Sequence, residues 1–368
     1  MIGYLIIVIL MVLWYALCKK PRTNYQKYFL IGMAVIMTLF YGLRASSVGS
    51  DTISYIDMFQ KDGLLSLNTL WEYMWEQKSP AYVLCEWLVY WLLPYPRVWL
   101  IITSAVFFGA FSYFLYHNSE DPFYSYYLFF TIFGTFQMTG LRQSIAMVFL
   151  MFAFEQIKRK KLIKYLLHVG AAYLFHRSAI VFLPMYLLMK RKVHRYDLPV
   201  LIALLVPIYM NRSLIFNSIK MYTSYYYFGE LNHGEPINFS IMIYAATLLG
   251  FFLCILLQNA EKKQSGDFQF DGRIYKASLD SVGIMKYMQY TNSMYIACLF
   301  MPLVAVNGSI RRIVMYFALF IILLIPKGLK AILTPSVNVL VRFVLAVLLL
   351  YLLISGTSSS SYYYTLCF

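Results

Sequence analysis

Charged residues are scarce in this sequence. Asp, Glu, Lys and Arg make up only 13% of its 368 residues, whereas hydrophobic residues make up 61%. A soluble domain carries about 25% charged residues, so this chain has too few to cover a surface that faces water. The five cysteines are odd in number and lack metal-binding spacing, which argues against a disulfide scaffold. These shortages exclude soluble enzyme domains and nucleic-acid readers, and they predict an integral membrane protein.

Apolar stretches that approach the length of a bilayer recur along the whole chain. A spanning helix needs about 17 to 25 mostly apolar residues. We therefore predict an all-α, polytopic integral membrane protein with about 10 transmembrane helices plus re-entrant or half helices. The predicted spans are Ile2–Cys18, Tyr28–Arg44, Val98–Tyr116, Phe123–Met138, Arg142–Ile157, Leu198–Met210, Phe239–Gln258, Thr291–Val306, Ile313–Pro326 and Ala331–Ser355.

Basic residues cluster in the loops between these spans. The segments KKPRTNYQK, KRKKLIK, KRKVHR and PKGLK all fall on one side when the first helix is retained with its amino terminus outside. Basic loops stay in the cytoplasm, so this side is the predicted interior. The net charge of +15 therefore indicates orientation in a membrane rather than a nucleic-acid partner.

Two apolar segments do not fit a simple crossing. Ser79–Leu93 is short for a span, and counting it as one would invert every later loop, so we predict a re-entrant or interfacial helix on the external side. Tyr165–Met189 lies between two basic clusters and must enter and return as two half-length helices that turn near His176. The predicted limits are 1–368 for a single transmembrane domain, 45–97 for the external loop, 165–189 for the hairpin and 259–290 for the cytoplasmic loop.

The predicted topology gathers ionisable residues at the external ends of the spans. Ionisable groups at a membrane boundary are costly, and each is a candidate for function. The guanidinium fork of arginine matches phosphate oxygens. The set therefore predicts a pocket for a substrate with an anionic phosphate head and an apolar tail. Its members are Arg44, Asp51, Asp57, Arg142, Arg311 and Arg312, with the turn at His176 directed toward them if the hairpin opens from the cytoplasm.

Each candidate also has a purely structural interpretation. Asp51 stands where it could cap the helix that follows it. Arg142, followed by Gln143, has the position of an interfacial anchor, and His176 lies in an apolar context typical of structural histidines. Arg342 differs, because it lies well inside the last span and needs an internal partner or an anion. The chain contains no HExxH motif, acidic DxD pair, Walker loop or dinucleotide fingerprint, so we predict no metal and no cofactor.

Four short motifs stand in order along the chain. They are Arg44 followed by Gly49-Ser50-Asp51 and Tyr55, LRQSIA at Leu141–Ala146, FHRSA at Phe175–Ala179, and RIVMYF from Arg312. In this order they resemble the motifs of the EpsG-like family of Wzy-type polysaccharide polymerases, which carry Gly-Thr-Asp-x-x-x-Tyr, Arg-Gln-x-x-Ala and Phe-His-x-Ser-Ala. Ser50 stands where that family more often has Thr, and Arg177 follows the histidine.

The resemblance implies a GT-C-like, metal-independent glycosyltransferase at the periplasmic face of the bacterial inner membrane. It would join undecaprenyl-pyrophosphate-linked repeat units into O-antigen, capsular or exopolysaccharide, with membrane lipids and a chain-length regulator as further partners. Such chemistry needs a base for the acceptor hydroxyl and cations for the pyrophosphate. The resemblance implies Asp51 as that base, with His176 as the competing catalytic candidate. The residues expected to bind substrate are Arg44, Arg142, Gln143, Arg312, Arg311, Arg177 and Tyr55.

Two other functions remain open from the sequence. A lipid-linked glycan flippase should place charged groups along a path open to both faces, whereas the candidates here gather on one side. A membrane O-acyltransferase would also use a buried histidine, with an Asn or Asp partner in a channel that faces the cytoplasm. The loops on either side of His176 do not fit that arrangement.

Overall fold

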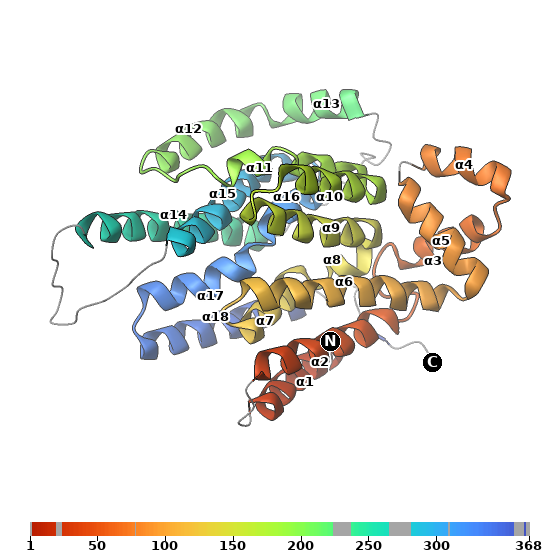
Figure 1. Ribbon diagram of the computed structural model, residues 1–368, viewed down its shortest axis with the longest axis horizontal. Helices are drawn as coiled ribbons and strands as arrows, with labels where there is room; N and C mark the ends of the chain where they lie inside the picture. The colour runs from red at the N-terminus through yellow and green to blue at the C-terminus, as the bar shows by residue number, and fades with distance from the viewer. Residues whose placement is uncertain are drawn as a thin grey trace. The chain divides into compact units, whose positions relative to one another are not determined.

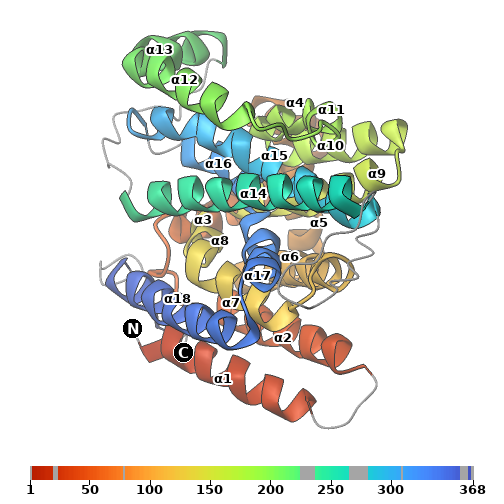
Figure 2. The ribbon, with the colours of Figure 1, turned by 90° about the vertical axis from the view of Figure 1, so that its left-hand side faces the viewer.

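The described residues of the computed structural model, which are 2–19, 24–77, 79–223, 237–264, 281–307, 310–356 and 364–365, form helices and no strand. Figures 1 and 2 show these helices. The helices divide into two compact units. The first unit comprises residues 1–183 and 339–368, and the second comprises residues 184–338. This arrangement confirms the predicted all-α class within the described part of the chain.

Several helices have the length and composition of membrane spans. Among the described residues, α6 (Pro96–Asn118) and α18 (Pro335–Gly356) are each long and apolar enough to cross a bilayer. Two bent pairs raise the number to four if each pair is one span. The pairs are α12 (Asp197–Met210) with the start of α13 (Arg212–Thr223), bent by 76°, and α16 (Ile310–Ala318) with α17 (Ile321–Ile332), bent by 43°. The larger count of about 10 spans stays a prediction.

The first unit contains a long series of helices joined by short turns. Three of them begin at a proline. Proline lacks a backbone N–H, and at the first helical position that group would have no partner within the helix in any case. Besides α6, its helices are α1 (Ile2–Cys18), α2 (Tyr25–Gly42), α3 (Thr52–Gly63), α4 (Leu67–Glu76), α5 (Pro80–Leu92), α7 (Pro122–Phe133), α8 (Phe136–Thr139), α9 (Leu141–Lys158), α10 (Leu162–Phe175), the 3₁₀ helix η1 (Arg177–Phe182) and most of α18.

Helices α2 and α6 pack closely along their length. Ser112 Oγ donates to the Leu30 carbonyl at 3.0 Å. At the other end of α2, a Cβ added to Gly42 would come within 2.8 Å of Ile101. Buried aromatic rings from α6 and α7 fill the space beside them, including Phe111 and Phe129 with ring centroids 4.4 Å apart. This core provides a rigid support for the loop that follows α2.

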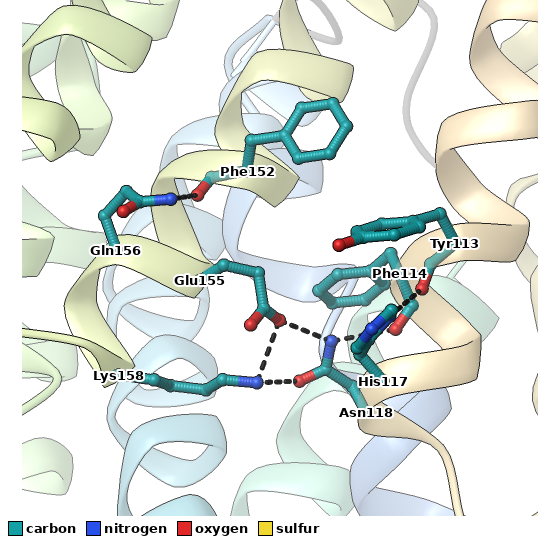
Figure 3. A network of polar contacts seen from close by, with 8 residues as sticks. All are labelled: Tyr113, Phe114, His117, Asn118, Phe152, Glu155, Gln156 and Lys158. Atoms are coloured by element: carbon teal, nitrogen blue, oxygen red, sulfur yellow. Dashed lines mark hydrogen bonds and ion pairs between the residues drawn. The ribbon is translucent and has the colours of Figure 1, made fainter.

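A polar network joins the last turns of α6 and α9 (Figure 3). The buried Asn118 side chain donates from Nδ2 to Glu155 Oε1 at 2.7 Å. Lys158 Nζ donates to Asn118 Oδ1 at 2.7 Å and to Glu155 Oε1 at 2.8 Å. Each buried polar group therefore has a partner, as low-dielectric surroundings require. The network fixes one end of α9, the helix whose other end carries Arg142.

Two predicted spans are wrong as single helices. The predicted span Phe123–Met138 is divided between α7 and α8 at Gly134, where an added Cβ would lie 2.3 Å from the Phe130 carbonyl oxygen. The predicted span Ile313–Pro326 is likewise divided between α16 and α17. Both segments are uniformly apolar, so hydropathy alone shows no boundary there.

The internal partner expected for Arg342 is Asp121. Arg342 Nη1 lies 2.5 Å from Asp121 Oδ2, and the guanidinium also stands over the Tyr124 ring. Tyr124 and Tyr127 donate to carbonyl groups of α18, at Arg342 and Ala346. Asp121 also caps α7 by accepting from the Tyr124 backbone amide at 3.1 Å. These contacts hold α18 against α7, and they confirm that the intramembrane arginine is paired.

The second unit contains α11 (Met185–Leu188), α12, α13, α14 (Ile237–Gln264), α15 (Ser281–Val304), α16 and α17. Helices α14 and α15 pack together through Thr247 Oγ1 and Cys298 Sγ, 3.0 Å apart. Asn292 on α15 donates to the Arg191 carbonyl at 2.7 Å, and Arg191 pairs with Asp197. Both helices extend into the loop predicted at 259–290, whose middle part, 265–280, lies outside the described residues.

Candidate active site

The beginning of α3 lies against the segment that leads into α9. Thr52 Oγ1 contacts the Met138 carbonyl at 3.3 Å, and the Tyr55 hydroxyl donates to the Thr139 carbonyl at 3.2 Å. Arg44 Nη2 donates to the same Met138 carbonyl at 3.3 Å. Tyr55 and Leu141 also belong to one buried hydrophobic cluster. Two of the sequence motifs, far apart in the chain, therefore meet in space: the one from Arg44 to Tyr55 and the one that begins at Leu141.

Arg44 is fully buried in a network of protein oxygens. Its Nε donates to Thr52 Oγ1 at 3.3 Å, and Nη1 donates to the Tyr41 carbonyl. Thr52 Oγ1 in turn donates to the Val48 carbonyl at 2.6 Å, which extends the network into the turn. In this arrangement Arg44 shapes the turn between α2 and α3, and its contact with a substrate phosphate stays a prediction.

Gly49 occupies a position in this turn that disfavours every other residue. Its φ of +92° is left-handed, and a Cβ added there would lie 2.7 Å from the Met138 carbonyl oxygen. We expect Gly49→Ala to destabilise the protein by about 1 to 3 kcal/mol. Thermal melting of the solubilised protein checks this, with Gly109→Ala on α6 as control, because a Cβ at Gly109 has no neighbour within 4 Å. Equal melting of the two variants contradicts the strain argument.

Asp51 directly precedes α3, which begins at Thr52. The helix start agrees with the capping interpretation, but the Asp51 side chain accepts no capping hydrogen bond. One of its oxygens instead accepts from Ser50 Oγ at 2.9 Å. The carboxyl group is partly exposed, so the capping role does not account for it fully.

Arg142 lies in the first turn of α9, with its guanidinium over the ring of Tyr82. Its Cζ is 5.2 Å from the Tyr82 ring centroid, and Nη2 contacts Met58 Sδ at 2.9 Å. The neighbouring Gln143 is buried. A cation held over an aromatic face keeps its charge available to an anion. This geometry differs from that of an arginine that extends along a lipid-facing surface.

A buried cluster beneath Arg142 connects four helices. Trp99 Nε1 donates to the Tyr82 hydroxyl at 2.9 Å, and Phe59 stacks on Trp99. Phe175, the residue before the predicted catalytic histidine, packs against the same cluster. The members are Tyr55, Phe59, Tyr82, Trp99, Leu100 and Leu141. The cluster therefore brings α3, α5, α6 and α9 to one place.

The helical structure is interrupted at His176, where the predicted hairpin turns. Helix α10 ends at Phe175, and His176 has extended backbone angles before η1. The Tyr165 hydroxyl, in the first turn of α10, donates to the Phe182 and Leu183 carbonyls, so the chain has returned along α10 by that point. Arg177 Nη2 donates to the Trp75 carbonyl at 3.3 Å. His176 and Arg177 thus belong to the first unit with Asp51 and Arg142.

Arg311 and Arg312 lie in the first turn of α16, in the second unit. Both side chains are partly buried. Their role in substrate binding stays a prediction.

Sequence reasoning missed two buried carboxyl groups near Arg142. Asp62 on α3 is 1% exposed and Glu86 on α5 is 0% exposed. Burial raises the pKa of both carboxyl groups, and the charge of Asp62 raises that of Glu86 further, while Arg142 lowers both pKa values. The sequence carried one signal, since Glu86 is the sole charged residue in the apolar segment Ser79–Leu93.

The comparisons with known proteins give a family. The sequence model described as "EpsG family" matches residues 27–367, nearly the whole chain. The chain belongs to the EpsG family. This is a family of Wzy-like polysaccharide polymerases, and the match confirms the resemblance drawn from the four motifs. No curated protein and no solved structure matches the chain. Family and apolar helices together identify a membrane protein.

The described residues offer no cluster of three or more His, Cys, Asp or Glu side chains that could hold a metal ion. The site combines the Arg142 guanidinium with a buried aromatic cluster that includes Tyr82 and Trp99. Such a site can hold an anion at Arg142 and apolar or ring-shaped groups on the cluster beneath it.

Proposed function

We propose that this EpsG-family protein is a GT-C-type glycosyltransferase that polymerises lipid-linked oligosaccharide repeat units. The donor would be the growing glycan on undecaprenyl pyrophosphate, and the acceptor a newly exported repeat unit at the periplasmic face of the bacterial inner membrane. The product would be O-antigen, capsular or exopolysaccharide. The family match over residues 27–367 carries the proposal. The meeting of the motifs that contain Asp51 and Arg142 supports it.

The reaction requires one bond to form as another breaks. The acceptor hydroxyl oxygen attacks the anomeric carbon of the donor glycan, and the bond from that carbon to the pyrophosphate oxygen breaks. The hydroxyl proton passes to a base, for which Asp51 is the proposed residue and His176 the competing one. Asp51 suits the role because its carboxyl group is partly exposed and lies beside a turn that Arg44 and Gly49 hold in place.

Negative charge develops on the departing pyrophosphate, and arginine side chains would stabilise it. Arg142 is the primary candidate, since it begins α9 and stands over Tyr82 instead of lying along lipid. Both features favour an anion, because a helix N-terminus also carries partial positive charge. Gln143, Tyr55, Arg44, Arg177, Arg311 and Arg312 are the further proposed binding residues.

A strain that lacks its own polymerase tests the function. We expect expression of the wild-type chain to restore a ladder of long glycans, and the empty vector to leave single repeat units on the terminal acceptor. Single repeats show that export has occurred, so this outcome separates a polymerase from a flippase. If the chain were a flippase, its expression would leave the single repeat units of the empty vector, and if it were an acyltransferase, it would leave single repeats with altered acyl groups. Either of those results contradicts the proposal.

A further inference from the structure

Asp62 and Glu86 form an unusual feature that the proposed chemistry does not use. Both lie on the helices of the segment 45–97, and both are almost completely buried. In their ionised forms, none of their four carboxyl oxygens accepts a hydrogen bond of normal length from a described residue. An isolated buried charge costs several kcal/mol, so two unbonded carboxylates side by side are not stable. A state with one negative charge and one proton on the pair reduces this cost.

The arrangement of the two carboxyl groups indicates that state. Arg142 contacts Met58, about one turn before Asp62 on α3. It also stands over Tyr82, about one turn before Glu86 on α5. This places the two carboxyl groups near one another, and each shifts the pKa of the other. Two carboxylates are both acceptors, so they can bond only if one of them holds a proton. When two carboxyl groups share one buried site, the negative charge of the first raises the pKa of the second. The second group then keeps its proton. Both groups are almost completely buried. Burial and the charge of Asp62 raise the pKa of Glu86 well above its usual value, so we assign the proton of the pair to Glu86.

The surrounding groups account for the remaining negative charge on Asp62. Arg142 from α9 acts on both carboxyl groups with its positive charge. Two tyrosine hydroxyls also act on the pair: Tyr73 from α4 lowers the pKa of Asp62, and Tyr82 from α5 lowers that of Glu86. Cys85, which precedes Glu86, is a further titratable neighbour. None of these three carries a positive charge. Arg142 is thus the counter-charge that acts on Asp62 among these neighbours.

We propose that Asp62 and Glu86 act as one singly protonated carboxyl pair, which positions the Arg142 guanidinium over Tyr82 for binding the pyrophosphate of the donor. Tyr82 supports Arg142 from below, at 5.2 Å from its ring centroid, and Trp99 fixes Tyr82 through its hydroxyl. A single negative charge on the pair attracts the guanidinium without neutralising it through a direct hydrogen bond. The pair is a positioning device, and only the identity of the ligand of Arg142 rests on the proposed function.

Infrared spectroscopy tests the shared proton independently of activity. We expect the purified protein at neutral pH to show the carbonyl stretch of a buried, protonated carboxylic acid, which is separate from the carboxylate bands. Glu86→Gln should remove this band. The matched control is Glu72→Gln, which removes an exposed carboxylate of α4 and should leave the band in place. A wild-type spectrum without the band overturns the inference, even if every variant fails to fold and even if the protein proves not to be a polymerase.

A double-mutant cycle tests the action through Arg142. We expect Asp62→Asn to slow polymerisation about tenfold through kcat in the wild-type background, and to have little further effect when Arg142→Ala is already present. Glu86→Gln should slow it less than Asp62→Asn, since glutamine resembles the neutral acid. Equal losses from Asp62→Asn in both backgrounds overturn the positioning role. Membrane levels and melting temperatures of all variants separate this outcome from loss of folding.

Discussion

Asp51→Asn should lower the rate of polymerisation by about 10²- to 10⁴-fold, the range that a positioned general base contributes. Asparagine keeps the size of the side chain and can still accept from Ser50, as Asp51 does at 2.9 Å. It cannot accept the proton of the acceptor hydroxyl. Single-turnover rates with a lipid-linked repeat unit are the measurement.

Asp57→Asn on the same helix is the matched control for Asp51→Asn. Asp57 also belongs to the ionisable set predicted at the external ends of the spans, but its side chain is exposed on α3, so the same change of charge there should leave the rate within about threefold. His176→Gln should retain more activity than Asp51→Asn. If Asp51→Asn polymerises normally while His176→Gln does not, the base is His176 and the assignment of Asp51 is wrong.

Arg142→Ala should slow polymerisation by about 10²- to 10³-fold, as the loss of a group that stabilises developing negative charge does. The effect should appear mainly in kcat, because charge on the pyrophosphate grows as the glycosidic bond breaks. Arg142→Lys should recover only part of the activity, since a point charge does not reproduce the planar fork over Tyr82. The measurement is again single-turnover formation of the longer glycan.

Arg159→Ala is the control for Arg142→Ala, because it removes an exposed arginine from the other end of the same helix. It should leave kcat unchanged. Equal rate losses in the two variants would show that net charge, and not the site at the start of α9, controls the reaction.

Helical class and the order of the motifs could be predicted from the sequence because both depend on local pattern. Scarce charge and apolar runs predict helices in lipid, and the start of α3 after Asp51 follows from capping preferences. The need of Arg342 for a partner also followed from its depth in the last span. Its identity did not, because Asp121 is 221 residues away in the chain.

The carboxyl pair and the broken spans were missed for a related reason. The helix that carries Asp62 is polar enough to predict an exposed surface, and burial arises only when α3 packs against α5. Gly134 stands in an apolar run, and a Cβ added there would lie 2.9 Å from the Tyr41 hydroxyl of α2, a neighbour that the local sequence does not show. Hydrophobic periodicity describes one segment at a time, whereas these features depend on which segments meet.

Reconstitution of the purified protein tests the central claim most directly. The protein in lipid vesicles would receive only undecaprenyl-pyrophosphate-linked repeat units, with neither nucleotide sugars nor other enzymes, and the glycans would be resolved by length. We expect a ladder of oligomers that remain lipid-linked, with release of undecaprenyl pyrophosphate, and no ladder from Asp51→Asn or Arg142→Ala. A wild-type protein that is folded and binds the repeat unit yet forms no dimer of repeats would contradict the account.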